Sequence, residues 1–259
     1  MTVNIPLSLL DMLHELAVRA GDTIMEVYKT DFDVEAKGDD SPVTEADRRA
    51  EALIHKSILA NVGAHFPIVG EEAFADGNAP DLDDGPFWLI DPLDGTKEFV
   101  SRNGEFTVNI ALIDAGRPIL GVVHAPVLGH TYLGSPHGAF FAERDQGPQP
   151  IGCRPWPTGG LTALVSKSHK TPETDVFLQD FEIAKEISAG SSLKFCTVAK
   201  GAADIYPRLG RTMEWDTAAG HAVLAAAGGS VTDLDGAALR YGKPGFENPH
   251  FVAKGKQDA

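Results

Sequence analysis

The order of strand-like and helix-like segments constrains the fold of this 259-residue chain most strongly. Residues 87–143 hold successive apolar segments separated by short turns, a pattern typical of strands joined by hairpins. Two segments of helical periodicity precede them, over residues 7–28 and about 45–61, and Thr44 is the expected N-cap of the second. Beyond residue 160, strand-like and helix-like segments alternate. The pattern predicts a layered α/β fold.

The individual elements can be bounded from apolar runs and breakers. Residues 66–69 form a short apolar run, and strands are expected over residues 87–91, 106–114, 118–126, 130–135, 138–143, 162–166, 185–190, 230–234 and 251–255. Further helices are expected over residues 172–181, 191–201 and 217–227, the second capped by Ser191 or Ser192 and the third by Asp216. Residues 30–43 are expected to form a loop or a short hairpin, and residues 73–86 a solvated loop.

The stretch over residues 145–160 is rich in Pro and Gly and is the best candidate for an internal boundary. We expect one catalytic unit over residues 1–259. It would consist of an N-terminal α+β subdomain of about residues 1–153 and a C-terminal α/β subdomain of about residues 154–259.

The charge balance excludes several classes of partner. The chain has 37 Asp and Glu against 22 Lys and Arg, a formal net charge of −15. Such a chain is repelled by polyanions, so binding to a nucleic-acid polymer and a polybasic membrane anchor are both excluded. The 43% of hydrophobic residues is ordinary for a globular protein, which excludes a disordered acidic tail.

The sequence also bears on the expected location. No apolar run approaches the ~18 residues of a membrane-spanning helix, and the first residues do not resemble a signal peptide. Cys153 and Cys196 are the two cysteines, with no Cys/His cluster, so neither a disulfide framework nor a structural zinc site is expected. These features predict a cytoplasmic location. Peripheral attachment to the cytoplasmic face of the inner membrane is left open.

Acidic residues stand at the ends of three predicted elements. Glu71 and Glu72 follow a short apolar run, Asp91 and Asp94 flank a turn after a strand, and Asp216 precedes a helix. Hard divalent cations such as Mg²⁺ prefer carboxylate, carbonyl and water oxygens. The backbone amides that follow Asp94 at Gly95 and Thr96 would suit a phosphate group.

Each of these features also has a purely structural interpretation. Asp-Pro and Asp-Gly are ordinary turn sequences, and a Glu pair is common on surfaces. Asp47, three residues after Thr44, would complete a capping box at a helix start. The combination of all of them favours a site over any one feature taken alone.

Four segments in order and spacing resemble the magnesium-dependent, lithium-sensitive phosphatase family that includes inositol monophosphatase. They are VTEAD (43–47), VGEEAF (69–74), LIDPLDGTKEFV (89–100) and EWDTAAGHAVLAAAGG (214–229). The resemblance spans nearly the whole chain and implies a layered α/β/α/β/α sandwich. DGTKEF and residues 190–222 are most similar to the bacterial 3′(2′),5′-bisphosphate nucleotidases of sulfur assimilation, which convert adenosine 3′,5′-bisphosphate to AMP and phosphate.

The resemblance implies a role for each matching residue. The metal ligands would be Glu71, Asp91, the carbonyl of Leu93, Asp94 and Asp216. They would hold two or three Mg²⁺ ions, a number that the sequence does not set.

The catalytic residues implied are Asp47, Thr96 and Glu72. Thr96 and Asp47 match a hydroxyl–carboxylate pair that orients and helps deprotonate the attacking water, and Glu72 matches a position near a second water or metal. Lys37 either lies near the metals or is a solvated loop lysine.

The substrate contacts implied by the resemblance lie in several segments. They are Glu71, Leu93, Asp94, Gly95, Thr96, Ser166, His169, Ser191, Lys194 and Asp216, with Ser192 as an alternative to Ser191. Lys194 would meet the second phosphate unless it is a solvated helix lysine, and His169 would meet the nucleoside unless it is a surface histidine. Tyr206 and Arg208 are candidates for the pocket wall, although Tyr206 could equally belong to the core.

Three functions remain open at this point. The first is the nucleotidase, acting on a small phosphorylated nucleotide. The second is a phosphatase of the same family for inositol phosphate or a sugar phosphate. The third is a non-catalytic metal or phosphate sensor, which the intact Asp47 and Thr96 pair disfavours. The chain is expected to be a monomer or a homodimer.

The expected mechanism is direct attack by water on phosphorus, with no protein nucleophile. Phosphatases with an aspartyl nucleophile separate their two aspartates by one residue, whereas Pro92 and Leu93 both intervene here. We therefore predict that hydrolysis in ¹⁸O-labelled water, in a single turnover, places one labelled atom directly in phosphate. Mass spectrometry of phosphate and of peptides measures this, and a trapped phosphoaspartate at Asp91 would contradict it.

Overall fold

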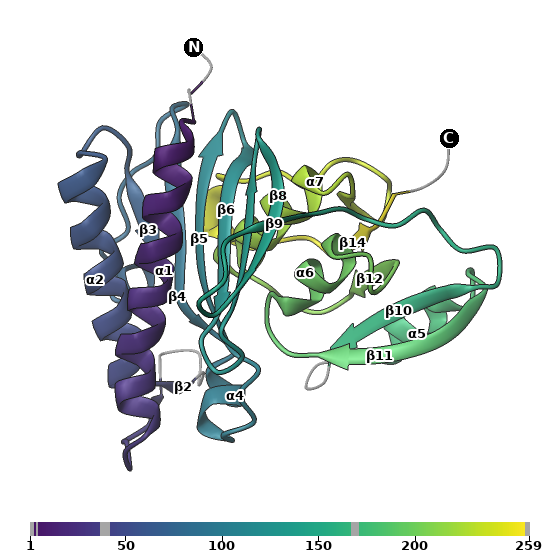
Figure 1. The fold of residues 1–259 in the computed structure, drawn as a ribbon, viewed down its shortest axis with the longest axis horizontal. Helices are drawn as coiled ribbons and strands as arrows, with labels where there is room; N and C mark the ends of the chain where they lie inside the picture. The colour runs from purple at the N-terminus through teal and green to yellow at the C-terminus, as the bar shows by residue number, and fades with distance from the viewer. Residues whose placement is uncertain (1–2, 4, 37–41, 167–170, 257–259) are drawn as a thin grey trace.

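The chain forms five layers, alternating helices and sheets. A computed structural model describes residues 3, 5–36, 42–166 and 171–256. Two long helices form one outer layer, followed by a seven-stranded sheet, a central helical layer, a five-stranded sheet and a short outer helix (Figure 1). The order of the layers confirms the predicted α/β/α/β/α sandwich.

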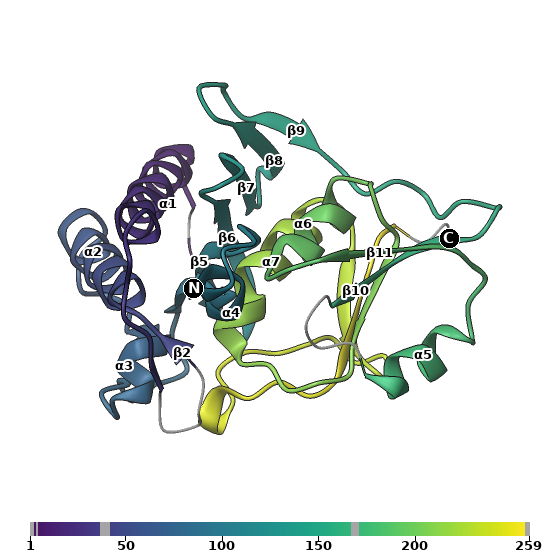
Figure 2. The ribbon, with the colours of Figure 1, turned by 90° about the horizontal axis from the view of Figure 1, so that it is seen from below.

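The outer helical layer consists of α1 (Leu7–Tyr28) and α2 (Glu45–Asn61), both with the bounds expected from the sequence. Between them, the two-residue strands β1 (Glu35–Ala36) and β2 (Pro42–Val43) pair antiparallel, which confirms the short hairpin. Both helices lie against one face of the large sheet (Figure 2). Their buried apolar side chains form one core cluster with the residues of that face.

The seven-stranded sheet follows the order β3-β4-β5-β6-β7-β8-β9, with β3 and β4 parallel and the other pairs antiparallel. Its strands are β3 (Ile68–Gly70), β4 (Phe87–Asp94), β5 (Thr107–Asp114), β6 (Arg117–Ala125), β7 (His130–Ser135), β8 (Gly138–Glu143) and β9 (Gln149–Ile151). Strand β4 begins with four apolar residues, Phe87 to Ile90, because this part is covered on both faces. Trp88 and Ile90 pack under α1 and α2, whereas Phe87 and Leu89 pack toward the central layer.

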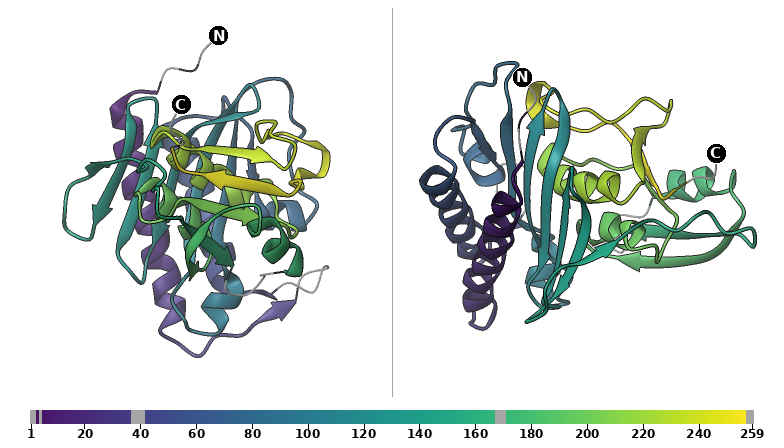
Figure 3. Two further views of the ribbon diagram at one scale, coloured as in Figure 1. Left: turned by 90° about the vertical axis from the view of Figure 1, so that its right-hand side faces the viewer. Right: turned by 45° about the horizontal axis from the view of Figure 1, so that its top comes forward.

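The central layer consists of α6 (Leu193–Ala199) and α7 (Glu214–Ala226), which pack between the two sheets (Figure 3). Helix α7 lies very close to the large sheet because glycines face it. A Cβ on Gly121 would lie 2.4 Å from the carbonyl oxygen of Ala219, and one on Gly134 would lie 2.5 Å from the Cα of Val223. The small residues of α7 and these two glycines therefore set the spacing of the layers.

The five-stranded sheet has the order β11-β10-β12-β14-β13. Its strands are β10 (Leu161–Ser166), β11 (Ile183–Ala189), β12 (Ile205–Arg208), β13 (Ser230–Asp233) and β14 (Phe251–Lys254). The outer helix α5 (Pro172–Leu178) and its apolar neighbours pack on the far face. A 3₁₀ turn, η1 (Pro244–Phe246), precedes β14.

Two helix starts differ from the sequence prediction. Helix α7 begins at Glu214, so Asp216 occupies its first turn and does not form the N-cap. Ser192 does occupy the N-cap position of α6, but its hydroxyl makes no capping bond and donates instead to the carbonyl of Asp216 at 2.8 Å. Strand β12 was not predicted. For Ser192 and for β12, which pairs with β14, a contact between distant segments decides the outcome, and the local sequence does not indicate it.

The predicted division into subdomains at about residue 153 stays a prediction. The large sheet ends at Ile151 and the small sheet begins at Leu161, yet α7 packs against strands of both. In the described ranges, none of the helices is both long and apolar enough to cross a membrane.

We predict that Gly134→Ala lowers the free energy of unfolding by about 1–3 kcal/mol, because the added methyl group must displace the backbone of α7. Urea denaturation measures the change. Gly147→Ala is the matched control, since a Cβ there meets no atom within 4 Å. Equal stability of the two variants would contradict the close approach of α7.

Candidate active site

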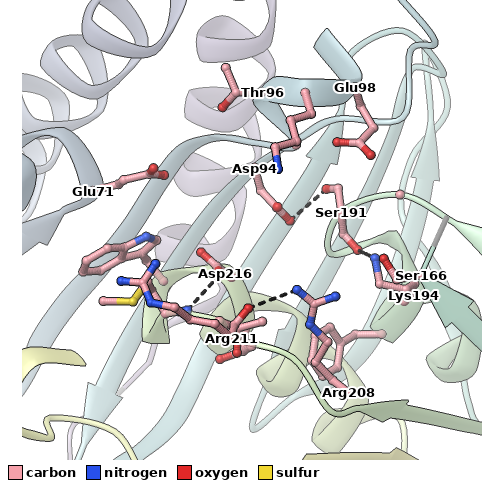
Figure 4. Close-up of a pocket in the computed structure, with 18 of the residues that line it drawn as sticks. Glu71, Asp94, Thr96, Glu98, Ser166, Ser191, Lys194, Arg208, Arg211 and Asp216 are labelled. Carbon is pink, nitrogen blue, oxygen red and sulfur yellow. Dashed lines mark hydrogen bonds between the residues drawn. The ribbon is translucent and has the colours of Figure 1, made fainter. Parts of the chain in front are cut away.

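A cavity of about 510 Å³ lies where the large sheet meets the central layer. Its walls come from α3 (Glu71–Ala75) and the starts of α4 (Thr96–Val100), α6 and α7, together with the ends of β4, β10 and β12. Figure 4 shows carboxylates on one side and basic side chains on the other. The predicted residues that line it are Glu71, Asp94, Gly95, Thr96, Ser166, Ser191, Lys194, Tyr206, Arg208 and Asp216.

Asp91 does not line this cavity itself but interacts with three carboxylates that do, and it lies at an irregularity in strand β4. The pairing of β4 with β5 shifts register between Asp91 and Asp94: Asp91 pairs with Asn109 and Asp94 with Thr107, so one extra residue of β4 lies between them. Because Asn109 and Thr107 share one face of β5, the shift places both aspartates on the same face. The Asp91 carboxylate accepts a hydrogen bond from the backbone N–H of Leu93 at 3.0 Å. Burial, followed by the negative charges of Glu71, Asp94 and Asp216, raises the pKa of Asp91 well above its ordinary value.

Asp216 is the second strongly perturbed carboxylate. Its Oδ2 accepts a hydrogen bond from the backbone N–H of Met213 at 2.9 Å, which fixes the side chain at the start of α7. Burial, and then repulsion from Asp94 and Glu71, raises the pKa of Asp216 to about 8. Two carboxylates with raised pKa values at one point are typical of a functional site, because a fold gains no stability from gathering them.

Asp94 is held by the loop before α6. Its Oδ2 accepts hydrogen bonds from the Ser191 hydroxyl at 2.8 Å and from the Ser192 backbone N–H at 2.6 Å (Figure 4 shows the first). Ser191 adopts a φ of +54°, an uncommon value for a residue with a side chain. This conformation points both the Ser191 hydroxyl and the next N–H at the same carboxylate oxygen.

Two buried polar residues of β5 extend this network across the layers. Thr107 shares a hydrogen bond with the Ser191 hydroxyl at 2.5 Å, and the Asn109 amide donates to the Ser192 hydroxyl at 2.9 Å. The same Asn109 amide is 3.4 Å from Asp94 Oδ2. The sequence analysis missed Thr107 and Asn109. The available indication was that Thr107 and Asn109 are polar residues in an apolar strand. Their hydrogen-bond partners, Ser191 and Ser192, lie more than 80 residues away in the chain, so the sequence does not reveal the contacts.

The Asp47 carboxylate contacts two neighbouring residues, Thr44 and Thr96. Its Oδ2 accepts hydrogen bonds from the backbone N–H of Thr44 at 2.8 Å and from the Thr44 hydroxyl at 2.7 Å, so the predicted capping box is confirmed. Its Oδ1 lies 3.4 Å from the hydroxyl of Thr96. The Thr96 hydroxyl is also 3.3 Å from the carbonyl oxygen of Leu93. The structural and the functional interpretation of Asp47 are thus compatible, because each uses a different oxygen.

The two glutamates at the start of α3 point to different places. Glu71 lines the cavity and faces Asp94 and Asp216 (Figure 4). Glu72 is buried and lines a neighbouring cavity of about 820 Å³ that it shares with Arg48 and His55. The proposed catalytic role of Glu72 stays a prediction.

Basic side chains form the opposite wall. Lys194 is buried, with only 5% of its surface exposed, and its Nζ donates to the carbonyl of Ser191 at 2.6 Å. It is therefore no solvated helix lysine. Burial lowers the pKa of Lys194 to about 8. Arg208 donates to the carbonyl of Arg211 at 3.0 Å, and both arginines line the cavity.

Other residues of the wall were not predicted from the sequence. Arg211 is one of them. The aromatic side chains of Phe74 and Trp215, whose ring centroids are 5.1 Å apart, are two more. Tyr206 both lines the cavity and is buried, so its two interpretations coincide. Lys37 and His169 lie outside the described residues.

The donor set fits a hydrated magnesium ion better than a bare one. Within the described residues, no group of three His, Cys, Asp or Glu side chains is arranged to enclose a metal by itself. The carboxylates of Asp94 and Asp216 are each turned toward backbone N–H groups. Mg²⁺ keeps several waters and uses few carboxylates together with substrate phosphates, so a loose ring of carboxylates suits it.

The layered fold and the carboxylate-lined cavity define an α/β protein of the inositol monophosphatase type. The model of the inositol monophosphatase family matches residues 7–257. The chain belongs to the inositol monophosphatase family.

Similar proteins from bacteria support this assignment. The chain is 46% identical over 253 residues to the 3′(2′),5′-bisphosphate nucleotidase CysQ of Escherichia coli strain K12, covering 94% of this chain and 98% of that protein. It is 39% identical to CysQ of Buchnera aphidicola, covering 96% and 95%.

Solved structures agree. The crystal structure of CysQ from Bacteroides thetaiotaomicron, described as a bacterial member of the inositol monophosphatase family, matches with a TM-score of 0.79 and 36% identity, covering 97% of this chain and 98% of that one. An IMPase of Thermotoga maritima matches with a TM-score of 0.77 and 27% identity, covering 95% and 91%.

The raised pKa of Asp216 predicts how stability depends on pH in metal-free protein. A folded pKa of about 8, above the unfolded value of 3.8, means that the native state binds the proton more tightly. Stability is therefore lost as the pH rises from about 4 to about 8. Asp216→Asn, which keeps an acceptor for Met213, should raise the free energy of unfolding at pH 8 by at least about 1 kcal/mol and change little at pH 4.

Urea denaturation in a chelator at both pH values measures this difference. A variant that is less stable than the wild type at pH 8 would show that the Asp216 carboxylate stabilises the fold, against this prediction.

Proposed function

We propose that this chain is a 3′(2′),5′-bisphosphate nucleotidase that removes the 3′-phosphate of adenosine 3′,5′-bisphosphate, giving AMP and phosphate. One observation carries the proposal: a single cavity is lined both by the carboxylates of Glu71, Asp94 and Asp216 and by the basic side chains of Lys194 and Arg208. A bisphosphate substrate needs both kinds of group. The carboxylate wall would serve the reacting phosphate, and the basic wall would bind the second phosphate. The relatives named CysQ support the same activity and a place in sulfur assimilation.

Magnesium is the proposed cofactor, with two or three ions per site. The residues that would hold it are Glu71, Asp91, the carbonyl of Leu93, Asp94 and Asp216. When bound, the ions would neutralise the phosphate oxygens, lower the pKa of water and stabilise the leaving alkoxide. The mutual repulsion of Asp91, Asp94, Asp216 and Glu71 supports this assignment, because a divalent cation would relieve it.

Thr96 and Asp47 are the proposed acid–base pair for the attacking water. The Thr96 hydroxyl can donate to Asp47 Oδ1, which leaves the Thr96 oxygen free to accept a hydrogen bond from water. A distance of 3.4 Å is long for two oxygens, and such contacts commonly shorten when substrate binds. Asp47 itself is held by two bonds from Thr44, so its orientation is fixed before substrate arrives.

The phosphates would meet different parts of the cavity. The backbone amides of Gly95 and Thr96, at the start of α4, are proposed to bind the 3′-phosphate. Lys194 is proposed to bind the second phosphate, and Ser166 and Ser191 the nucleoside. His169 remains a candidate contact on sequence alone.

A substrate panel at fixed Mg²⁺ tests the proposed function. Phosphate release from adenosine 3′,5′-bisphosphate should exceed release from inositol 1-phosphate and from a sugar phosphate, and a chelator should abolish it. Preference for inositol 1-phosphate would assign the chain to another branch of the family. No release from any substrate would favour a sensor. The cytoplasmic location and the oligomeric state stay predictions.

Lys194 supplies a prediction about substrate choice and pH. A charge-assisted hydrogen bond is worth about 1.5–3 kcal/mol, so Lys194→Ala should raise KM for adenosine 3′,5′-bisphosphate about ten- to hundredfold. KM for a simple phosphate monoester should change little. Because the Lys194 pKa of about 8 sets its charge, the wild-type KM for the bisphosphate should rise above pH 8, and this rise should vanish in the variant.

Steady-state kinetics from pH 6 to 9.5 measure both effects, with Lys185→Ala, an exposed lysine on β11, as the matched control. Equal changes in KM for the two substrates would remove Lys194 from the second-phosphate site.

A further inference from the structure

Glu51 connects helix α2 to the start of α3. Its two carboxylate oxygens accept hydrogen bonds from successive backbone N–H groups, Oε2 from Glu72 and Oε1 from Ala73, each at 2.9 Å. The first N–H groups of any helix lack partners within that helix, and Gly70, at the N-cap position of α3, has no side chain to supply one. A residue 20 positions earlier in the chain therefore caps this helix.

The contact fixes the backbone that directly follows Glu71. Glu71 is the first residue of α3, and the two N–H groups that follow it are fixed by the same carboxylate. Helix α3 has five residues, and two of them, Glu71 and Glu72, carry the same charge as Glu51 of α2. Three carboxylates near the start of α3 repel one another. The backbone N–H groups there offset this repulsion, because they favour a negative charge at a helix N-terminus.

We propose that Glu51 is a positioning residue that acts through Glu71, orienting it in the cavity for divalent-cation binding. The inference rests on the proposed function insofar as Glu71 is taken as a metal ligand. Residues that orient metal ligands commonly contribute ten- to hundredfold to metal affinity.

Gly70 gives an independent indication that the carboxylate needs this position. A Cβ at Gly70 would lie 2.5 Å from the Glu51 carboxylate carbon and from one of its oxygens. Gly70 has φ −106° and ψ 152°, which any residue adopts, so its backbone does not require glycine. The absence of a side chain there instead leaves room for the Glu51 carboxylate.

The first test compares Glu51→Gln with the wild type. The amide retains one acceptor oxygen but brings an NH₂ group against an N–H donor, so the paired contact is lost while the helix is kept. We expect the Mg²⁺ concentration that gives half-maximal thermal stabilisation of substrate-free protein to rise about ten- to hundredfold. Glu15→Gln, an exposed glutamate of α1, is the matched control and should behave as wild type.

Glu51→Asp separates position from charge. It keeps the negative charge but is shorter by one methylene group, so it should weaken Mg²⁺ binding as Glu51→Gln does. Wild-type Mg²⁺ affinity in Glu51→Asp would show that charge alone matters and would overturn the proposal.

Gly70→Ala tests the same contact without altering the glutamate. The new methyl group should displace the Glu51 carboxylate, which is the end of a flexible side chain, and weaken Mg²⁺ binding to the same degree. In Glu51→Ala protein, adding Gly70→Ala should cause no further loss, because the side chain that it displaces is gone. Additive losses, or wild-type affinity in both Gly70→Ala and Glu51→Gln, would overturn the proposal.

The readout distinguishes this inference from the proposed function. Thermal stabilisation by Mg²⁺ requires no substrate, so the comparison holds whether the chain hydrolyses a nucleotide or another phosphate. Absence of any Mg²⁺ effect in the wild type would refute both the metal site and the role of Glu51. Failure of the nucleotidase assay alone would leave the role of Glu51 supported by its own variants.

Discussion

The structure depends on burying like-charged carboxylates at the place where two layers meet. Asp91 is almost completely buried, and burial together with the charges of Glu71 and Asp94 raises the pKa of both Asp91 and Asp216. Such an arrangement is unfavourable in itself, because desolvation and repulsion both disfavour the charged forms. The fold offsets this cost with backbone donors, the N–H of Leu93 for Asp91 and that of Met213 for Asp216. A divalent cation would offset the rest.

The same place joins the large sheet to the central helical layer. Asp94 on β4 and Asn109 on β5 belong to the large sheet, whereas Ser191 and Ser192 lead into α6 of the central layer. The Ser192 hydroxyl then reaches the backbone of Asp216 in α7. The geometry of the cavity therefore depends on how the layers pack, and a change in the spacing of α7 would reach the carboxylates through these bonds.

Local chemistry made much of this fold predictable. Thr44 and Asp47 are three residues apart, so their capping box follows from sequence, as do the hairpin strands β7 and β8, whose predicted bounds are those observed. The carboxylates at Glu71, Asp91, Asp94 and Asp216 were found by their places at element ends, and their family resemblance grouped them.

The remaining features depend on contacts between distant segments. Nothing near Ser192 in the sequence indicates that its hydroxyl bonds to Asp216 rather than capping α6. Asn109 is one polar residue in an apolar strand until the fold brings Ser192 beside it. Lys194 is buried only because the loop before α6 folds over it and supplies the Ser191 carbonyl.

The net charge of −15 is a property of the whole chain and does not describe the charges inside the cavity. Lys194, Arg208 and Arg211 line one wall, and cations on the opposite carboxylates would make the site attractive to an anionic substrate. Anomalous X-ray scattering from crystals grown with Mn²⁺ tests this account most directly. The account predicts metal peaks among the carboxylates of Glu71, Asp91, Asp94 and Asp216, and peaks found only at other acidic surfaces would contradict it.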